Sequence, residues 1–149
     1  MPNNEYTIQA ASPAISGELV RFFEEFYAIT DDPSEIENYV DQFTADAVFI
    51  RGGAEPTRGA DEIRTWRKHA FDYMKSCKHI PHKMFSLGPE SNEVMLYGQV
   101  TIGHLNSQIS MGGYAVRAIL EKDRIEQKWR LAYYEVFMDV QELSKAGAL

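Results

Sequence analysis

The chain has 149 residues, of which 44% are hydrophobic and 25% charged, and its formal net charge at pH 7 is −7. This length and composition are typical of one ordinary globular domain. The negative charge argues against nucleic acids and anionic membrane surfaces as partners, because those partners need clustered lysine and arginine.

The cysteine count and the first residues of the chain indicate the cellular compartment in which the protein is expected. The single cysteine, Cys77, cannot form an internal disulfide. The N-terminal stretch has no basic region followed by an apolar core, and no apolar run approaches the length of a membrane span. We therefore expect a cytoplasmic protein in which Cys77 is an inert, half-buried thiol.

The first part of the chain predicts a short lead-in and a helix. Residues 1–13 are polar and are expected to form a flexible lead-in before a single domain over residues 14–149. Between Ile15 and Ile29 the apolar residues recur at helical spacing, which predicts an amphipathic helix over residues 14–29.

The segment DDPSE marks the start of a second helix. Asp32 is placed to cap it, Pro33 suits its first position, and Glu35 stands three residues after the cap. The next apolar run, DAVFIRGG, predicts a short strand that ends at its glycines, and residues 61–75 follow as a third helix.

The second half changes to strand periodicity. Four long strands are expected, at residues 79–88, 93–104, 109–121 and 127–139. A helical turn is expected over the last ten residues, 140–149. Helices followed by antiparallel strands predict an α+β fold, with three helices packed on one face of a strongly curved sheet. Such a sheet forms a cone with an apolar pocket at its open end, where small ligands bind.

Five strings carry a resemblance to a known group. FYAITDDPSEIENYVDQFTADAVFIRGGAEPTRGADEIRTW is similar to the opening of the SnoaL-like branch of the NTF2-like superfamily. HIPHKMF, EVMLYGQVTIGHL, GGYAVRAILEK and WRLAYYEVFMD resemble its long meander. The resemblance spans about residues 14–140 and implies the NTF2-like (cystatin-like) α+β cone. It also implies a homodimer formed through the outer face of the sheet, with Met95, Tyr97 and Thr101 as candidate contacts.

Within this superfamily the nearest mechanistic parallel is scytalone dehydratase. That family carries one histidine at the start of the strand after the third helix and another at the end of the next strand, where this chain has His79 and His104. The resemblance places Asp32 at the family's aspartate and Asp31 at its tyrosine. Arg51 stands where the family has a second tyrosine, so the pattern is kept only in part.

Strand parity supports an inward position for His104. It shares a face with Val94, Leu96, Val100 and Ile102, the face richer in branched aliphatic residues. His79 and His82 are three apart and point to opposite faces of a regular strand, although Pro81 between them calls for an edge or a bulge. We expect His79 to face inward with His104, and His82 to lie outside or at the rim. The alternative for His104 is a core histidine bonded to a backbone carbonyl.

Other side chains are candidates for the pocket wall. Most aromatic residues are core by their spacing, but some are expected to line the pocket and bind substrate. The candidate substrate-binding residues are Phe26, Tyr27, Arg51, Trp66, Tyr114 and Tyr134. The Arg51 guanidinium needs a partner, which could be Glu55, Glu135 or an anionic substrate oxygen. Arg64, Arg67 and Lys68 are interpreted as a solvated helix face, and His69 as a surface residue.

The expected function is cofactor-independent acid–base chemistry on a small apolar, aromatic or polycyclic secondary metabolite. His104, oriented by Asp32, would remove a proton next to a carbonyl, and His79 would donate to the departing hydroxyl or to the enolate oxygen. No metal is expected, because the two histidines lack the spacing of a zinc pair. Two alternatives stay open: a cyclase in which pocket shape does the work, and a non-catalytic binding or dimerisation module.

Overall fold

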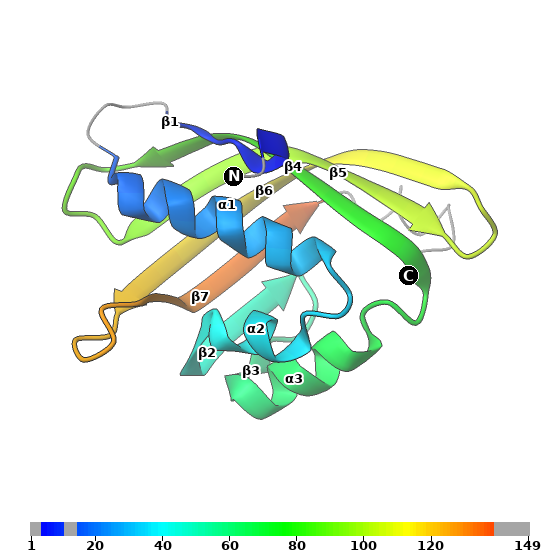
Figure 1. Cartoon of the computed structure of the whole chain (residues 1–149), viewed down its shortest axis with the longest axis horizontal. Coiled ribbons are helices and arrows are strands. Elements are labelled where there is room, and N and C mark those ends of the chain that lie inside the picture. Colours follow the sequence, from blue (N-terminus) through cyan, green and yellow to red (C-terminus); the bar gives the residue numbers. More distant parts are fainter. Residues whose placement is uncertain (1–3, 11–14, 139–149) are drawn as a thin grey trace.

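The computed structural model describes residues 4–10 and 15–138 (Figure 1). In chain order the elements are the 3-10 turn η1 (Asn4–Tyr6), β1 (Gln9–Ala10), α1 (Gly17–Asp31), α2 (Ile36–Asp41), β2 (Phe43–Arg51), β3 (Thr57–Arg58), α3 (Gly59–His69), β4 (Met74–Ser86), β5 (Glu93–His104), β6 (Ile109–Lys122) and β7 (Trp129–Met138). The helical turn expected at residues 140–149 lies outside the described residues. Within the described part, no helix has the length and apolar character needed to cross a membrane.

One seven-stranded sheet forms the body of the molecule, in the order β1-β4-β5-β6-β7-β2-β3. Strands β4 to β7 form the expected antiparallel meander, while β2 runs parallel to β7 and β1 runs parallel to β4. Helix α1 lies across one face and contacts β4, and α3 packs on β2 and α2 (Figure 1). This arrangement confirms the predicted α+β fold with helices on a curved sheet.

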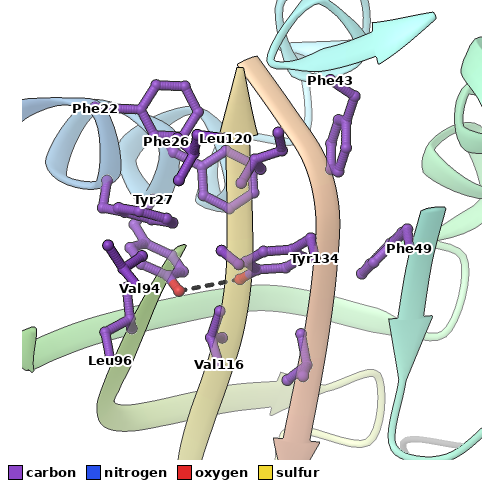
Figure 2. Close-up of a cluster of buried hydrophobic side chains, with 14 of the residues drawn as sticks. Phe22, Phe26, Tyr27, Phe43, Phe49, Val94, Leu96, Val116, Leu120 and Tyr134 are labelled. Atoms are coloured by element: carbon purple, nitrogen blue, oxygen red, sulfur yellow. Dashed lines mark hydrogen bonds between the residues drawn. The ribbon is translucent and has the colours of Figure 1, made fainter. Parts of the chain in front are cut away.

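The core lies between α1 and the inner face of the sheet (Figure 2). Helix α1 contributes Leu19, Phe22, Phe23, Phe26 and Tyr27. Facing them are the alternate residues of the long strands, all buried: Val94, Leu96, Val100, Ile102, Val116, Ala118 and Leu120. The intervening residues of β5, such as Met95 and Tyr97, are exposed on the outer face. The sequence parity of this strand is thereby confirmed.

Strand β4 is irregular at Pro81, as the missing amide of proline requires. Its register with β5 shifts between Pro81 and Lys83, which is a bulge. Opposite the bulge stands Gly98, where a Cβ atom would come within 2.3 Å of the Ile80 carbonyl oxygen. Glycine is therefore needed for the close approach of the two backbones.

The helix boundaries differ from the sequence prediction at the DDPSE segment. Helix α1 continues to Asp31, and Asp32 does not cap α2, which begins after Glu35 without a side-chain cap. The Asp32 carboxylate instead accepts from the backbone amide and the hydroxyl of Ser34, at 2.9 and 2.6 Å. Pro33 explains the difference, because the residue before a proline is held extended and leaves the helix.

Two further expectations are wrong. Residues 4–10 of the lead-in are not loose: Tyr6 and Ile8 are buried, and β1 pairs with β4. Arg67 is not on a solvated face: it is 3% exposed and donates to the backbone carbonyls of Ile29, Thr30 and Asp32. The last carbonyls of a helix have no partner within it, so Arg67 satisfies the C-terminal end of α1.

Candidate active site

A cavity of about 140 Å³ opens between α1, α3 and the inner face of the sheet. Aromatic side chains make up much of its wall: Phe26, Tyr39, Phe49, Trp66, Phe71 and Tyr134. The polar side chains in the wall are Thr30, Arg51, Arg67, Cys77 and His79. The cavity is thus an apolar hollow with a few polar groups, the usual character of a small-molecule site.

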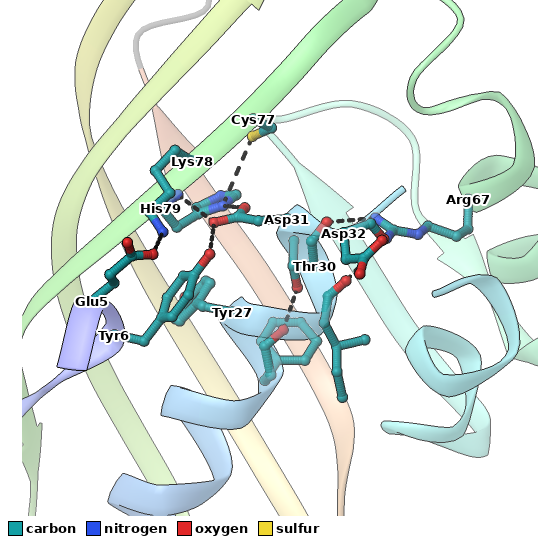
Figure 3. A network of polar contacts seen from close by, with 12 residues as sticks. Glu5, Tyr6, Tyr27, Thr30, Asp31, Asp32, Arg67, Cys77, Lys78 and His79 are labelled. Carbon is teal, nitrogen blue, oxygen red and sulfur yellow. Dashed lines mark hydrogen bonds and ion pairs between the residues drawn. The ribbon is translucent and has the colours of Figure 1, made fainter. Parts of the chain in front are cut away.

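The central polar contact joins His79 to Asp31 (Figure 3). His79 Nδ1 lies 2.6 Å from Asp31 Oδ1, and the backbone amide of His79 donates to Asp31 Oδ2 at 2.7 Å. The hydroxyl of Tyr6 donates to the same Oδ2 at 2.8 Å. Both side chains are nearly buried, at 13% exposed for His79 and 6% for Asp31. Three groups therefore hold this carboxylate: the Nδ1 and the backbone amide of His79 and the hydroxyl of Tyr6.

The second ring nitrogen of His79, Nε2, is left for a ligand. It has no hydrogen-bond partner among the described residues, and the His79 side chain lines the cavity. Because Asp31 occupies Nδ1, the opposite edge of the ring is the one available to a bound molecule.

The protonation of His79 follows from two opposing influences. Burial alone would lower its pKa, but the hydrogen bond to Asp31 and the neighbouring Cys77 outweigh burial and raise the pKa of His79 to about 9. The ring is therefore an imidazolium at neutral pH, held against the Asp31 carboxylate. Burial raises the pKa of Tyr6 to about 12, so Tyr6 remains a donor to Asp31.

The rings of two tyrosines pack against the His79 ring. Tyr27 stacks on it with ring centroids 5.1 Å apart, and Tyr114 meets it edge-on at 5.2 Å. The Tyr27 hydroxyl is 3.0 Å from that of Tyr134, which lies in the cavity wall (Figure 2). Burial raises the pKa of Tyr27 and Tyr134 well above the ordinary value, so both are neutral phenols. The Tyr114 hydroxyl is buried without a hydrogen-bond partner.

The structure does not bring His104 to His79. In the pairing of β4 with β5, His79 stands opposite Val100 and His104 stands opposite Met74 at the far end of the ladder. His104 is 2% exposed, as expected of an inward residue, but its Nε2 is bonded to Ser110 Oγ at 2.7 Å. It does not line the cavity. The expected pairing of the two histidines is therefore wrong, because His104 lies four positions further along the extended strand than Val100, the residue opposite His79.

Asp32 also lacks the contact with a histidine that was expected of it. Its carboxylate is exposed and bonded to Ser34, so it orients neither histidine. Hydrogen bonds from the Ser34 side chain and backbone hold the pKa of Asp32 below its usual value. Asp31, and not Asp32, is the aspartate bonded to a histidine of the site, because α1 runs to Asp31 and turns its side chain towards His79.

The other predicted site residues divide into two groups. Phe26, Arg51, Trp66 and Tyr134 line the cavity, while Tyr27 and Tyr114 lie behind His79. His82 is exposed beside Tyr97, and His69 is exposed and bonded to Asp72, as expected for both. The half-buried thiol expected for Cys77 is confirmed, but Cys77 lies in the cavity wall with Sγ 3.8 Å from His79 Nδ1.

The sequence reasoning missed Asp31, Arg67 and Tyr6. A signal existed for Asp31, because it follows Tyr27 by four residues and so continues the buried face of α1. Ile63 and Arg67 share a helix face by the same spacing. Nothing in the sequence indicates Tyr6, whose contact with Asp31 joins residues 25 positions apart.

Asp31, Cys77 and His79 are also the described group that could hold a metal ion, with donor atoms within 4.8 Å of one another. The separation of His79 Nδ1 from Asp31 Oδ1 is 2.6 Å, shorter than the roughly 3.3 Å between nitrogen and oxygen ligands on one tetrahedral zinc ion. The geometry is that of a hydrogen-bonded pair.

Comparison with known proteins gives the fold. No protein-family model matches the chain, and no curated protein does. Solved structures do match it. An NTF2-like protein of unknown function from Burkholderia pseudomallei aligns over 90% of this chain and 100% of its own, with a TM-score of 0.74 and 11% identity.

Two more structures agree. A proposed SnoaL-like polyketide cyclase from Jannaschia aligns over 94% of this chain and 97% of its own, with a TM-score of 0.67 and 12% identity. A protein with a cystatin-like fold from Nostoc punctiforme aligns over 84% and 94%, with a TM-score of 0.64 and 17% identity. At these identities the likeness is one of fold, and it confirms the NTF2-like cone expected from the resemblance.

Proposed function

We propose that this NTF2-like chain is a cofactor-independent acid–base enzyme for a small, cyclic, largely apolar metabolite. The observation that carries the proposal is the buried Asp31–His79 pair, whose free ring nitrogen belongs to a side chain in the wall of an aromatic cavity. A strongly shifted histidine in a hollow, with one specific charged partner, is typical of catalytic sites.

The chemistry follows from the protonation state of His79. As an imidazolium held by Asp31, it donates a hydrogen bond or a proton through Nε2 to an oxygen of the substrate. If that oxygen is a carbonyl, the donation stabilises the enolate that forms when the neighbouring carbon loses a proton. If it is a hydroxyl, the donation helps it leave as water. Dehydration, double-bond isomerisation and ring closure all use this step.

His104 was expected to accept the proton, but it does not line the cavity, so a different residue has to accept it. Among the titratable side chains of the cavity wall, Cys77 has its sulfur 3.8 Å from His79 Nδ1. We propose Cys77 as the residue to test for this role.

The volume of the cavity narrows the substrate. About 140 Å³ is close to the roughly 150 Å³ of an engineered cavity that holds one benzene ring. We therefore propose a single-ring compound in place of the polycyclic one that the sequence suggested. The SnoaL-like neighbour is described as a polyketide cyclase, which supports secondary metabolism as the setting.

Proton exchange tests the proposal directly. In deuterated water, 2-cyclohexenone and 3-hydroxycyclohexanone are expected to exchange their α-protons, as followed by NMR, faster with the protein than without it. His79→Gln is expected to slow this exchange by about 10²-fold or more. His69→Gln, the matched change at an exposed histidine, should leave it unchanged. The rate with wild type should fall above pH about 9, as His79 loses its proton. Equal rates in the two variants would refute the role of His79.

A second candidate is a non-catalytic binding module, which the small size of the cavity favours. It predicts that single-ring compounds bind while no exchange is seen with wild type at any pH. Alanine at Cys77 separates the two further, because an enzyme using this thiol loses exchange while a binder keeps its affinity.

We further propose that the chain forms a homodimer through the outer face of the sheet. The apolar residues Phe85, Met95, Tyr97, Met111 and Phe137 of β4 to β7 are all exposed. The pairing register brings Phe85 beside Met95 and Thr101 beside Met111, and Phe85 stacks with Tyr97 at 6.3 Å. Exposed apolar side chains gathered on one sheet face support a protein contact there.

A further inference from the structure

We infer that the substrate carries a carboxylate group, which Arg51 binds at the cavity wall. The inference rests on the proposed function, because it concerns the same cavity, and it names the chemical class of the molecule bound there. Arg51 is the last residue of β2, and its side chain lies among the aromatic residues of the wall.

The Arg51 guanidinium has no anionic partner in residues 4–10 and 15–138. Its Cζ atom lies 4.4 Å from the centroid of the Trp66 ring and 5.8 Å from that of Phe49. No carboxylate of the described residues pairs with it. Of the two partners that the sequence offered, Glu55 is exposed, and Glu135 accepts from the Tyr133 hydroxyl at 2.7 Å. Stacking on aromatic faces leaves the N–H edges of a guanidinium unsatisfied.

A second guanidinium in the same wall is only partly satisfied. Arg67 donates to three neutral backbone carbonyls, which satisfy its terminal nitrogens but do not neutralise its charge. Its Nε is buried and has no hydrogen-bond partner within the described part of the chain. Its Cζ lies 4.5 Å from the centroid of the Tyr39 ring, which itself is 5.9 Å from that of Trp66 under Arg51.

The charge of the wall is opposite to that of the whole protein. The chain has a net charge of −7, yet the cavity is lined by Arg51, Arg67 and His79 and, among the described residues, by no acidic side chain. Asp31, behind the wall, pairs with His79, and no carboxylate of the described residues pairs with Arg51. A half-buried guanidinium without a counterion is costly, and a bound anion offsets that cost.

A carboxylate matches this arrangement better than other anions of the same size. The flat fork of a guanidinium binds the two oxygens of a carboxylate in parallel. The aromatic middle of the cavity has room for one ring. A small cyclic acid would therefore place its ring among Phe26, Phe49 and Tyr134, with its carboxylate at Arg51.

Equilibrium binding of two unreactive probes tests the inference. Benzoate and benzamide have nearly the same shape and differ in charge. By calorimetry at low ionic strength, wild type is expected to bind benzoate at least about tenfold more tightly than benzamide. Arg51→Met should bring the two affinities to within about twofold. Arg124→Met, at an exposed arginine in the turn between β6 and β7, should leave the preference unchanged. Arg51→Lys, which keeps the charge without the fork, should give an intermediate ratio.

Several outcomes would overturn the inference. These are equal affinities of wild type for the two probes, an equal loss in the Arg51 and Arg124 variants, or no binding of benzoate at up to roughly 20 mM. Neither probe undergoes proton transfer, so the result is independent of catalysis. If wild type shows no preference for benzoate over benzamide but still exchanges the α-protons of ketones, it is an enzyme for neutral substrates. If wild type prefers benzoate but exchanges no α-protons, it is a binder of small acids.

Discussion

Asp31 holds His79 through both oxygens of its carboxylate. Oδ2 accepts from the His79 backbone amide at 2.7 Å, and Oδ1 lies 2.6 Å from the Nδ1 of the ring. The two contacts come from one residue, so the carboxylate fixes the position of the strand and the orientation of the imidazole together. The ring cannot flip without losing a buried charge-assisted hydrogen bond, and Nε2 stays on the ligand's side.

Replacing the carboxylate should change the protonation of this ring. In Asp31→Asn the His79 pKa is expected to fall from about 9, because the hydrogen bond and the charge of Asp31 that raise it are lost while burial, which lowers it, remains. NMR titration of the histidine ring resonances measures it. Asp32→Asn is the matched control: its carboxylate is exposed, so the His79 pKa should not change. Equal effects of the two changes would contradict the assignment of Asp31.

Stability should depend on pH in a defined window. The His79 pKa in the folded state, about 9, is raised above that of the unfolded chain, so its contribution is complete below pH 6.5. The contribution is lost as the pH rises towards 9, and it amounts to at most about 3 kcal/mol. Urea unfolding at intervals from pH 6 to pH 9.5 should show the decline in wild type and in His69→Gln, but not in His79→Gln. A decline that persists in His79→Gln would point to a different group.

Replacing Arg67 should lower the free energy of unfolding more than replacing an exposed arginine of a helix does. Arg67→Ala removes the guanidinium donor from the carbonyls of Ile29, Thr30 and Asp32, of which Ile29 and Asp32 keep a backbone donor, and should reduce the free energy of unfolding by about 2–4 kcal/mol. Arg64→Ala, on the same helix, removes pairs with Glu37 and Asp61 at the surface and should matter far less. Chemical denaturation compares them, and similar losses would contradict the capping role.

The proposed dimer makes its own prediction. Tyr97→Lys places a charge in the centre of the apolar outer face and is expected to shift the chain towards monomer, as measured by sedimentation velocity. Ile125→Lys, at an equally apolar but isolated residue in the β6–β7 turn, should leave the association state unchanged. A wild type that sediments as a monomer at roughly 100 µM would rule out a dimer of useful affinity.

Local patterns predicted the fold well. The spacing of Leu19, Phe22 and Phe26 indicated α1, and the alternation from Val94 to Ile102 indicated both β5 and its inner face. These predictions held because each depends on which side of one element is buried. The bulge at Pro81 was foreseen for a similar reason, since it follows from a missing amide within the strand.

The site was predicted less completely, because it depends on contacts between distant segments. His79 was predicted to be an inward-facing site residue from its position at the start of a strand. Its partner, Asp31, lies 48 residues away in the sequence. The choice of Asp32 over Asp31 failed because α1 continues to Asp31, two residues beyond its predicted end, while Pro33 holds Asp32 extended outside the helix. The position of His104 depended on the strand register, which the hydrophobic pattern does not give.

The hydroxyl of Tyr6 reaches Asp31 from outside residues 14–140, the stretch that carries the sequence resemblance. Residues 4–10 therefore supply one of the three donors that hold the Asp31 carboxylate. A recombinant version trimmed to begin at residue 14 would keep α1 to α3 and β2 to β7 and still lose that donor. Affinity tags are for the same reason better fused elsewhere than at Met1, and inactivity of a shortened protein would say nothing about the His79 chemistry.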